Sequence, residues 1–164
     1  MNSVSRRLFL AFAVALPAAC GAGPGDAPPP RPEPPLYPNE TPQLRALIKA
    51  AAAENQIPVT LVQRVVIRES THRPGARNGP YYGLMQILPA TARSMGFRGK
   101  PSDLLDAETN LRYACRYLRG AWLVSGGDEA KAVMWYARGY YYEAKRLGLL
   151  EETGLRGGLY TGGN

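Results

Sequence analysis

Apolar residues recur every three or four positions over most of the chain between Thr41 and about residue 148, and this spacing predicts a series of α-helices. Thr41 followed by Pro42 is typical of a helix start, with Thr41 as the N-cap and Pro42 at the first helical position. A second helix is expected to open at Pro58. No internal repeat and no strand-rich region competes with this interpretation, so the predicted fold class is mainly α.

The helix that follows Pro58 has an apolar face that ends in an acid. Val62, Val65, Val66 and Glu69 share this face at the spacing i, i+3, i+4 and i+7. Burial and the negative end of the helix dipole both disfavour a charged carboxylate, so the pKa of Glu69 is expected to be raised. Glu69 is therefore suited to donate a proton as a general acid. The alternative is a structural ion pair with a nearby arginine.

Loop and helix signals alternate in the middle of the chain. Residues 71–82 hold two glycines and two prolines and are expected to form a loop. The apolar run 83–88 predicts a short turn or strand. A brief helix is expected over 89–95, followed by a second loop at 97–102.

Two aspartates are predicted to cap the longer helices of the C-terminal half. Asp106 would cap a helix that runs to about Val124, and Asp128 would cap one that breaks at Gly139. A last helical segment is expected after Gly139. Residues 149–164 include five glycines in sixteen positions, so no regular element is predicted there.

The first twenty residues resemble an export signal. Two arginines, Arg6 and Arg7, precede a nine-residue apolar run that is too short to span a bilayer. The segment 1–20 ends in Pro-Ala-Ala-Cys, which resembles a lipoprotein cleavage box with Cys20 as the lipidated residue. We therefore expect an exported, periplasmic protein anchored to a membrane through a lipid on Cys20. A soluble periplasmic protein is the alternative, and the choice between the general and the twin-arginine export route stays open.

Residues 21–42 are predicted to form a proline-rich linker. Nine of the nineteen residues from Pro24 to Pro42 are proline, which favours an extended polyproline II tether between the signal segment and the domain. A disordered tail is the alternative.

Charge narrows the choice of partner. From Gln43 onward the chain has 17 lysines and arginines against 10 acids, so the whole formal charge of +7 lies in the predicted domain and the tail that follows it. This balance fits an anionic partner such as nucleic acid, an acidic membrane surface or a carboxylate-bearing wall polymer. The export signal argues against nucleic acid, and no zinc-ligand spacing or phosphate-binding glycine loop is present. No metal or cofactor is predicted. Cys115 lies on an apolar helical stripe and is expected to be a buried hydrophobe.

Several short motifs resemble those of the soluble lytic transglycosylase family, whose fold is that of goose-type lysozyme. The first and most specific block is Glu69-Ser70, Pro74, Ala76, Gly83-Leu84-Met85-Gln86, Pro89 and Thr91-Ala92. The later motifs are Asp103-Leu104-Leu105-Asp106, Asn110, Tyr117-Leu118, Tyr136 and Gly139. The resemblance covers about residues 43–148. It implies a lysozyme-like helical domain with a short non-helical segment at residues 83–86.

The resemblance also implies an activity. Family members cleave the β-1,4 bond between N-acetylmuramic acid and N-acetylglucosamine in peptidoglycan without water, which leaves a 1,6-anhydro end. By this likeness Glu69 is the catalytic residue: it protonates the glycosidic oxygen and then takes a proton from the C6 hydroxyl. Two alternatives remain, a lysozyme-type hydrolase of the same fold and a non-catalytic peptidoglycan-binding protein.

Other site residues are carried over by position. Gln86 and Met85 match residues that line the subsites beside the scissile bond, Gln86 by hydrogen bonds and Met85 by apolar contact. Tyr136 matches a tyrosine that approaches the catalytic acid and orients it. Ser70, which follows the acid in the motif, is carried over as a substrate-binding residue. The single histidine, His72, is expected to have a packing role.

Three further positions match the family less closely. Asn78 falls where the family tends to place a serine that contacts the N-acetyl group, in a loop one residue shorter than usual. Tyr82 is expected to touch a sugar face, and its neighbour Tyr81 has the same chemistry. The family continues its tyrosine motif as Tyr-Asn-Ala-Gly, whereas this chain has Tyr-Ala-Arg-Gly. Arg138 therefore either replaces the lost polar sugar contact or binds a carboxylate of a peptide stem.

Overall fold

The computed structural model describes residues 33–156, and the unit that contains all of the helices and strands begins at Pro35. In chain order the elements are α1 (Pro42–Glu54), α2 (Val59–Ser70), β1 (Arg77–Asn78), β2 (Tyr81–Tyr82), α3 (Pro89–Ser94), the 3₁₀ helix η1 (Pro101–Leu105), α4 (Ala107–Val124), α5 (Glu129–Arg138) and α6 (Tyr141–Leu147). The predicted fold class, mainly α, is confirmed. Within the described part of the chain, no helix is both long enough and apolar enough to cross a membrane.

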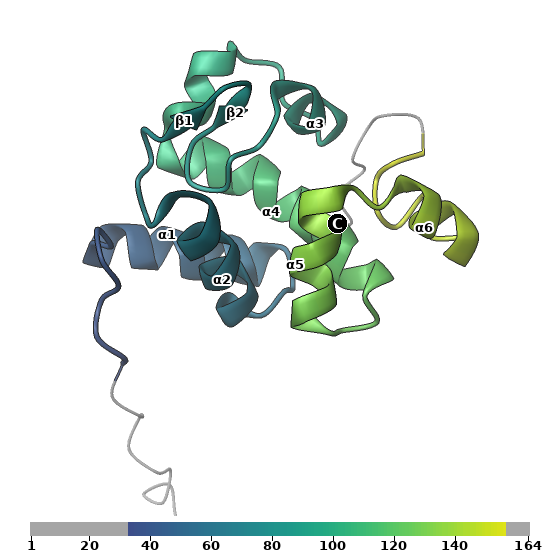
Figure 1. Ribbon diagram of the computed structural model, residues 1–164, viewed down its shortest axis with the longest axis horizontal. Helices are drawn as coiled ribbons and strands as arrows, with labels where there is room; N and C mark the ends of the chain where they lie inside the picture. Colours follow the sequence, from purple (N-terminus) through teal and green to yellow (C-terminus); the bar gives the residue numbers. More distant parts are fainter. Residues whose placement is uncertain (1–32, 157–164) are drawn as a thin grey trace, which may run out of the picture. The chain divides into compact units, whose positions relative to one another are not determined.

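Helix α4 occupies the centre of this unit. Helices α1, α3, α5 and α6 and the 3₁₀ helix η1 all pack against it (Figure 1). Its buried stripe includes Leu111, Cys115 and Leu118, each no more than 1% exposed. Asp106 caps the helix as predicted, because its carboxylate accepts a hydrogen bond from the backbone N–H of Thr109 at 2.8 Å.

Helix α2 carries the face on which the expectation for Glu69 rests. Val62, Val65 and Val66 are completely buried, which confirms the predicted orientation of this helix. α2 packs against α1 and α5. It ends at Thr71, whose backbone is left-handed with φ 51°. The chain therefore turns away sharply two residues after Glu69.

The segment expected to be a loop at residues 71–82 contains a small antiparallel hairpin. Strands β1 and β2 pair Arg77 with Tyr82 and Asn78 with Tyr81. Tyr82 and Ile87 also exchange backbone hydrogen bonds at 3.1 Å each, so the turn at 83–86 folds back onto the hairpin. A second correction concerns residues 97–102, where η1 occupies part of the predicted loop.

The segments just outside both predicted ends of the domain pack against its core. At the N-terminal end, residues 35–42 were assigned to the linker, but Glu40 is only 7% exposed and belongs to the folded unit. At the C-terminal end, Leu149, Leu150 and Leu155 pack against the core, and Thr153 is 1% exposed. The predicted signal segment with Cys20 and the linker up to residue 32 lie outside the described residues.

Candidate active site

The C-terminal end of α2 presents Glu69 at a surface pocket. The Glu69 side chain is 23% exposed, and the Arg68 Nε lies 3.4 Å from its Oε1. Burial raises the pKa of the Glu69 carboxyl, and the positive charge of Arg68 opposes this increase without cancelling it. The arginine contact weighed as an alternative is therefore present, but desolvation has the larger effect on Glu69.

Asn110 of α4 stabilises the turn at residues 83–86 through three hydrogen bonds. The Asn110 Oδ1 accepts a hydrogen bond from the Met85 N–H at 3.0 Å, and its Nδ2 donates to the carbonyls of Tyr82 and Leu104, both at 2.8 Å. Gly83 has φ +73°, and a Cβ there would collide with the Asn110 side chain and the Leu104 carbonyl. Only glycine fits this position, because both the backbone conformation and the close approach exclude a side chain.

Gln86 is strained and only partly satisfied. Its backbone has φ 47°, which is unusual for a residue other than glycine and typical of functional sites. The Nε2 donates to the carbonyls of Gly83 at 2.8 Å and of Ala76 at 3.1 Å, which fixes the orientation of the amide. The Oε1 has no hydrogen-bond partner among the described residues. This oxygen is itself buried, so it is an unpaired acceptor inside the fold and is not open to the groove.

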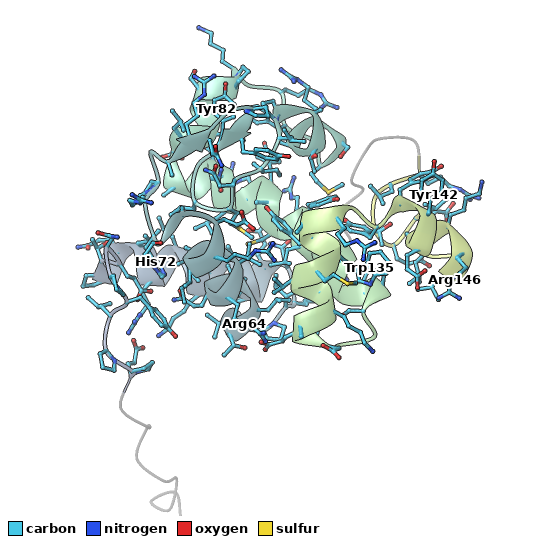
Figure 2. The ribbon with its side chains drawn as sticks, viewed as in Figure 1. Arg64, His72, Tyr82, Trp135, Tyr142 and Arg146 are labelled. Atoms are coloured by element: carbon cyan, nitrogen blue, oxygen red, sulfur yellow. The ribbon has the colours of Figure 1, made fainter. Side chains whose placement is uncertain are left out.

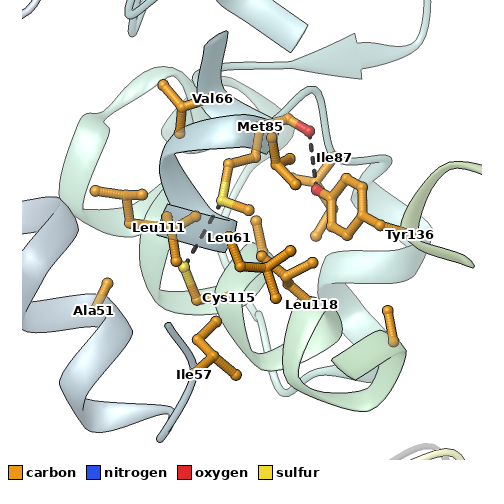
Figure 3. Packing of buried hydrophobic residues seen from close by; sticks show 14 of the residues in the cluster. Ala51, Ile57, Leu61, Val66, Met85, Ile87, Leu111, Cys115, Leu118 and Tyr136 are labelled. Atoms are coloured by element: carbon orange, nitrogen blue, oxygen red, sulfur yellow. Dashed lines mark hydrogen bonds between the residues drawn. The ribbon is translucent and has the colours of Figure 1, made fainter. Parts of the chain in front are cut away.

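Tyr136 of α5 closes the pocket from the other side. Its hydroxyl donates a hydrogen bond to the Met85 carbonyl at 2.9 Å, as Figure 3 shows. Burial raises the pKa of Tyr136 well above its usual value, and the nearby Glu69 carboxylate adds to the effect. The Tyr117 ring meets the Tyr136 ring edge-on, with centroids 5.5 Å apart. Tyr136 is therefore a neutral, rigidly held hydroxyl that joins α5 to the turn.

These elements enclose the Glu69 pocket, a hollow of about 340 Å³. It is lined by Arg68, Glu69, Asn78, Tyr81, Gln86, Tyr136 and Ala137. The structure thus brings together four of the predicted site residues from segments far apart in the sequence: Glu69, Asn78, Gln86 and Tyr136. Glu69 is the only carboxylate among these lining residues.

A second hollow of about 300 Å³, the Arg138 pocket, adjoins the first. Its lining residues are Tyr81, Gln86, Ile87, Leu88, Thr91, Tyr117, Tyr136, Ala137, Arg138 and Gly139. The two pockets share Tyr81, Gln86, Tyr136 and Ala137, so they lie side by side, and together they are called the groove. Arg138 is the fifth predicted site residue that reaches this groove.

Three predicted substrate contacts are corrected. Ser70 is 2% exposed, and its hydroxyl is turned back toward the Val66 carbonyl at 3.3 Å. Met85 is completely buried with its sulfur 3.8 Å from that of Cys115, so it contributes a backbone carbonyl instead of an apolar surface (Figure 3). Tyr82 lines neither pocket; Arg77 lies over its ring at 4.7 Å.

Two aromatic residues line the groove besides Tyr136: Tyr81, which was expected to have the same chemistry as Tyr82, and Tyr117, which was not among the predicted site residues. Tyr81 lines both pockets and is 42% exposed, because neighbouring residues of a strand point to opposite faces and Tyr82 points the other way. Predicting the strand would have separated the two tyrosines. Tyr117 lines the Arg138 pocket from α4, and its position beside the buried stripe of that helix was the available signal.

His72 has the packing role that was predicted for it. The residue is 1% exposed, and its ring stacks on the Tyr37 ring. The distance from its Nε2 to the Gln63 Oε1 is 2.7 Å, which is a hydrogen bond. Figure 2 places it beside α1 and α2, far from Tyr82 on the hairpin. Across residues 33–156 no group of three or more histidine, cysteine and acidic side chains is arranged to hold a metal ion.

Comparison with known proteins gives one finding that covers most of the domain. The family model described as "Transglycosylase SLT domain" matches residues 46–148. This range begins within α1 and ends just after α6, so it includes every residue that lines the groove. No curated protein and no solved structure matches the chain.

Proposed function

The chain belongs to the transglycosylase SLT domain family, and from this membership we propose that it is a lytic transglycosylase that cleaves peptidoglycan and leaves 1,6-anhydro-N-acetylmuramic acid ends. Members of this family act on peptidoglycan in the cell envelope. The reaction and its product are the finer part of the proposal. The observation that carries it is the chemistry of Glu69, a carboxyl of raised pKa and the only acid that lines the groove.

A single acid favours this reaction over ordinary hydrolysis. Most glycosidases need two carboxyl groups, one to protonate the leaving oxygen and another to act as nucleophile or to activate water. No second carboxylate lines either pocket of the described groove. In a transglycosylase the attacking group is the substrate's own C6 hydroxyl, so one carboxyl can serve in both steps.

In the first step Glu69 acts as the general acid. Its protonated carboxyl gives a proton to the glycosidic oxygen, and the bond between that oxygen and C1 of the muramic acid breaks. The N-acetylglucosamine leaves with a free hydroxyl. The raised pKa of Glu69 supports this step because it keeps a larger fraction of the carboxyl protonated at neutral pH.

In the second step the Glu69 carboxylate acts as the base. It takes the proton of the C6 hydroxyl while that oxygen forms a bond to C1, which closes the anhydro ring. The carboxyl is thereby restored to its protonated form, and no water is consumed. Tyr136 is suited to hold the turn opposite Glu69, since its hydroxyl is bonded to the Met85 carbonyl.

Binding is assigned to the remaining polar and aromatic groups of the Glu69 pocket. Gln86 lines this pocket and would contact a sugar through the part of the residue that is exposed. Asn78 offers both a donor and an acceptor at the pocket edge. Tyr81, which is exposed there, would stack on a sugar face.

The test compares the wild-type protein with Glu69→Gln on intact peptidoglycan. The change removes the proton donor but keeps the size and polarity of the side chain. We expect the variant to bind sacculi as the wild type does and to release no anhydro products, measured by mass spectrometry of the soluble fragments. Reducing ends instead of anhydro ends would identify a hydrolase, because the two products differ by one water. Equal release by both proteins would exclude Glu69 as the catalytic acid.

We also propose that the protein is exported and held at a membrane by a lipid on Cys20. A substrate in the cell envelope requires export, and the first twenty residues resemble such a signal. The expected result is that the wild-type protein partitions into detergent and carries the mass of a lipid, whereas Cys20→Ala does neither. A soluble wild-type protein without added mass would reject the anchor while leaving the enzymatic proposal intact.

A further inference from the structure

The Arg138 pocket contains a positive charge with no acid opposite it. Arg138 is exposed at the C-terminal end of α5, and none of the residues that line this pocket is acidic. Its Nη1 donates a weak hydrogen bond to the Met134 sulfur at 3.9 Å. Within residues 33–156 no carboxylate pairs with it. By contrast, Arg112 on the outer face of α4 lies 2.9 Å from the Glu108 carboxylate.

The position of this charge relates it to the glycan site. The Arg138 pocket shares a wall made of Tyr81, Gln86 and Tyr136 with the Glu69 pocket. The Arg138 pocket therefore lies directly beside a ligand that fills the Glu69 pocket. Arg138 lines only the second pocket and is the only ionisable group other than tyrosine among the residues that line it.

The charge is not explained by the sugars. In a strand that bears its stems, the lactyl carboxyl of each muramic acid is held in the amide bond to the stem, so the sugars carry no charge and an unopposed guanidinium contributes little to binding them. The negative groups of peptidoglycan are the carboxylates of the peptide stems that are attached to its muramic acids. A guanidinium binds a carboxylate through two parallel hydrogen bonds, which makes arginine suited to this group.

The other walls of the pocket also fit a peptide. Leu88 offers apolar surface, and Tyr117 contributes an aromatic ring from α4. Thr91, at the start of α3, adds a hydroxyl that can bond a peptide group. A hollow of mixed apolar and polar lining with one cation suits a short peptide that ends in, or carries, a carboxylate.

We propose that the Arg138 pocket is a subsite for the peptide stem and that Arg138 binds one of its carboxylates. This inference rests on the proposed function, because it takes the glycan strand to lie in the Glu69 pocket. It makes the protein selective for strands whose stem carboxylates are free over strands whose stem carboxylates have been converted to amides. The selectivity is a difference in binding, so it lies in KM more than in kcat.

The experiment uses the purified protein and two substrates, glycan strands with their stems and the same strands after a carbodiimide and ammonia have converted the stem carboxylates to amides. kcat and KM are measured for the wild type, Arg138→Gln, Arg138→Lys and the control Arg112→Gln. We expect Arg138→Gln to lower the ratio of kcat/KM on untreated strands to that on amidated strands by about threefold to tenfold, through KM. Arg138→Lys should recover part of the ratio, because it keeps the charge but not the two-pronged geometry. Arg112→Gln should leave it unchanged.

A ratio in Arg138→Gln equal to that of the wild type would overturn the subsite. So would an equal loss on both substrates, since that outcome makes Arg138 a sugar contact. The same variants, made together with Glu69→Gln, are also tested for binding to both kinds of strand by sedimentation. If the wild type cleaves neither substrate, the proposed function fails, and the sedimentation ratio then decides the subsite on its own.

Discussion

A buried ion pair at the start of the domain provides the most demanding test of the fold. Glu40 lies in the segment that sequence patterns assigned to the linker, yet its side chain is completely buried. Its two oxygens accept hydrogen bonds from the Arg45 side chain at 2.5 and 3.2 Å, from the Gln63 amide at 2.7 Å and from the Tyr37 N–H at 2.9 Å. These contacts join residues 37–40 to α1 and to α2, the helix that ends near Glu69.

The change Glu40→Gln keeps the shape of the side chain and removes its charge. The Arg45 guanidinium, in a residue only 8% exposed, would then lose the Glu40 carboxylate. Removing one partner of a buried ion pair costs about 3–5 kcal/mol of the free energy of unfolding. For a domain of this size that loss corresponds to a decrease in Tm of about 10–20 °C.

The pH dependence gives an independent value for the stability that the charge of Glu40 contributes. The pKa of Glu40 is lowered from 4.5 to about 2: burial raises it, but the hydrogen bonds from Arg45, Tyr37 and Gln63, together with the Arg45 charge, outweigh that effect. At about 1.4 kcal/mol for each pKa unit, the charged form adds about 3 kcal/mol to stability. Because the folded-state pKa lies below the unfolded one, this contribution is present above pH 4.5 and is lost as the pH falls toward 2.

The assay is urea unfolding of the wild type and Glu40→Gln at a series of pH values between neutral and about 2. Unfolding is monitored by far-ultraviolet circular dichroism. We expect the difference between the two proteins to be largest near neutral pH and to shrink as Glu40 becomes protonated in the wild type. Glu54→Gln is the control: Glu54 is 62% exposed and 4.0 Å from Arg116, so its loss should change stability by less than about 1 kcal/mol. A difference below about 1 kcal/mol for Glu40→Gln at pH 7, or one that does not vary with pH, would refute the reasoning.

Two further predictions concern the site, and a third concerns the net charge of the chain. In Arg68→Met the cation that opposes burial is gone, so the pKa of Glu69 should rise further and the alkaline limb of the pH profile of kcat/KM should move to higher pH; a limb that moves down would contradict the assignment. In Asn110→Leu the Met85 N–H and two carbonyls lose their buried partner, so urea unfolding should reveal a loss of about 2–4 kcal/mol, and a loss below about 1 kcal/mol would argue against this role. Sedimentation with sacculi should weaken as salt is added if the formal charge of +7 attracts the anionic polymer, and binding that does not depend on salt would reject that attraction.

Much of the helical framework was predictable because its signals are local. The caps at Thr41, Asp106 and Asp128 are present with their hydrogen bonds, since a cap needs only residues within one turn. The buried face of α2 follows from the spacing of its valines. Local signals failed where short elements are stabilised from a distance: the hairpin at residues 77–82 depends on the turn that folds back onto it, and that turn depends on Asn110.

The same division applies to the groove. Glu69, Asn78, Gln86, Tyr136 and Arg138 were identified from motifs, and all of them line it. Ser70, Met85 and Tyr82 belong to the same motifs but do not. A motif specifies residue types at a spacing, whereas exposure depends on which face of each element the rest of the chain covers. Ser70 and Met85 face the core, and the alternation of the strand directs Tyr81 into the groove and Tyr82 away from it.

The sequence by itself determined the mainly helical fold, the family and the acid on the inner edge of α2. Periodicity, caps and short motifs each depend only on residues that are close together in the sequence. Tertiary structure decided what surrounds that acid. Only the packing of α2, α4, α5 and the hairpin places a single, partly buried carboxyl in the groove. Packing also leaves Arg138 without an acid in its pocket and buries Glu40 with Arg45. These properties depend on desolvation and on distances between residues remote in sequence, and no local pattern records either.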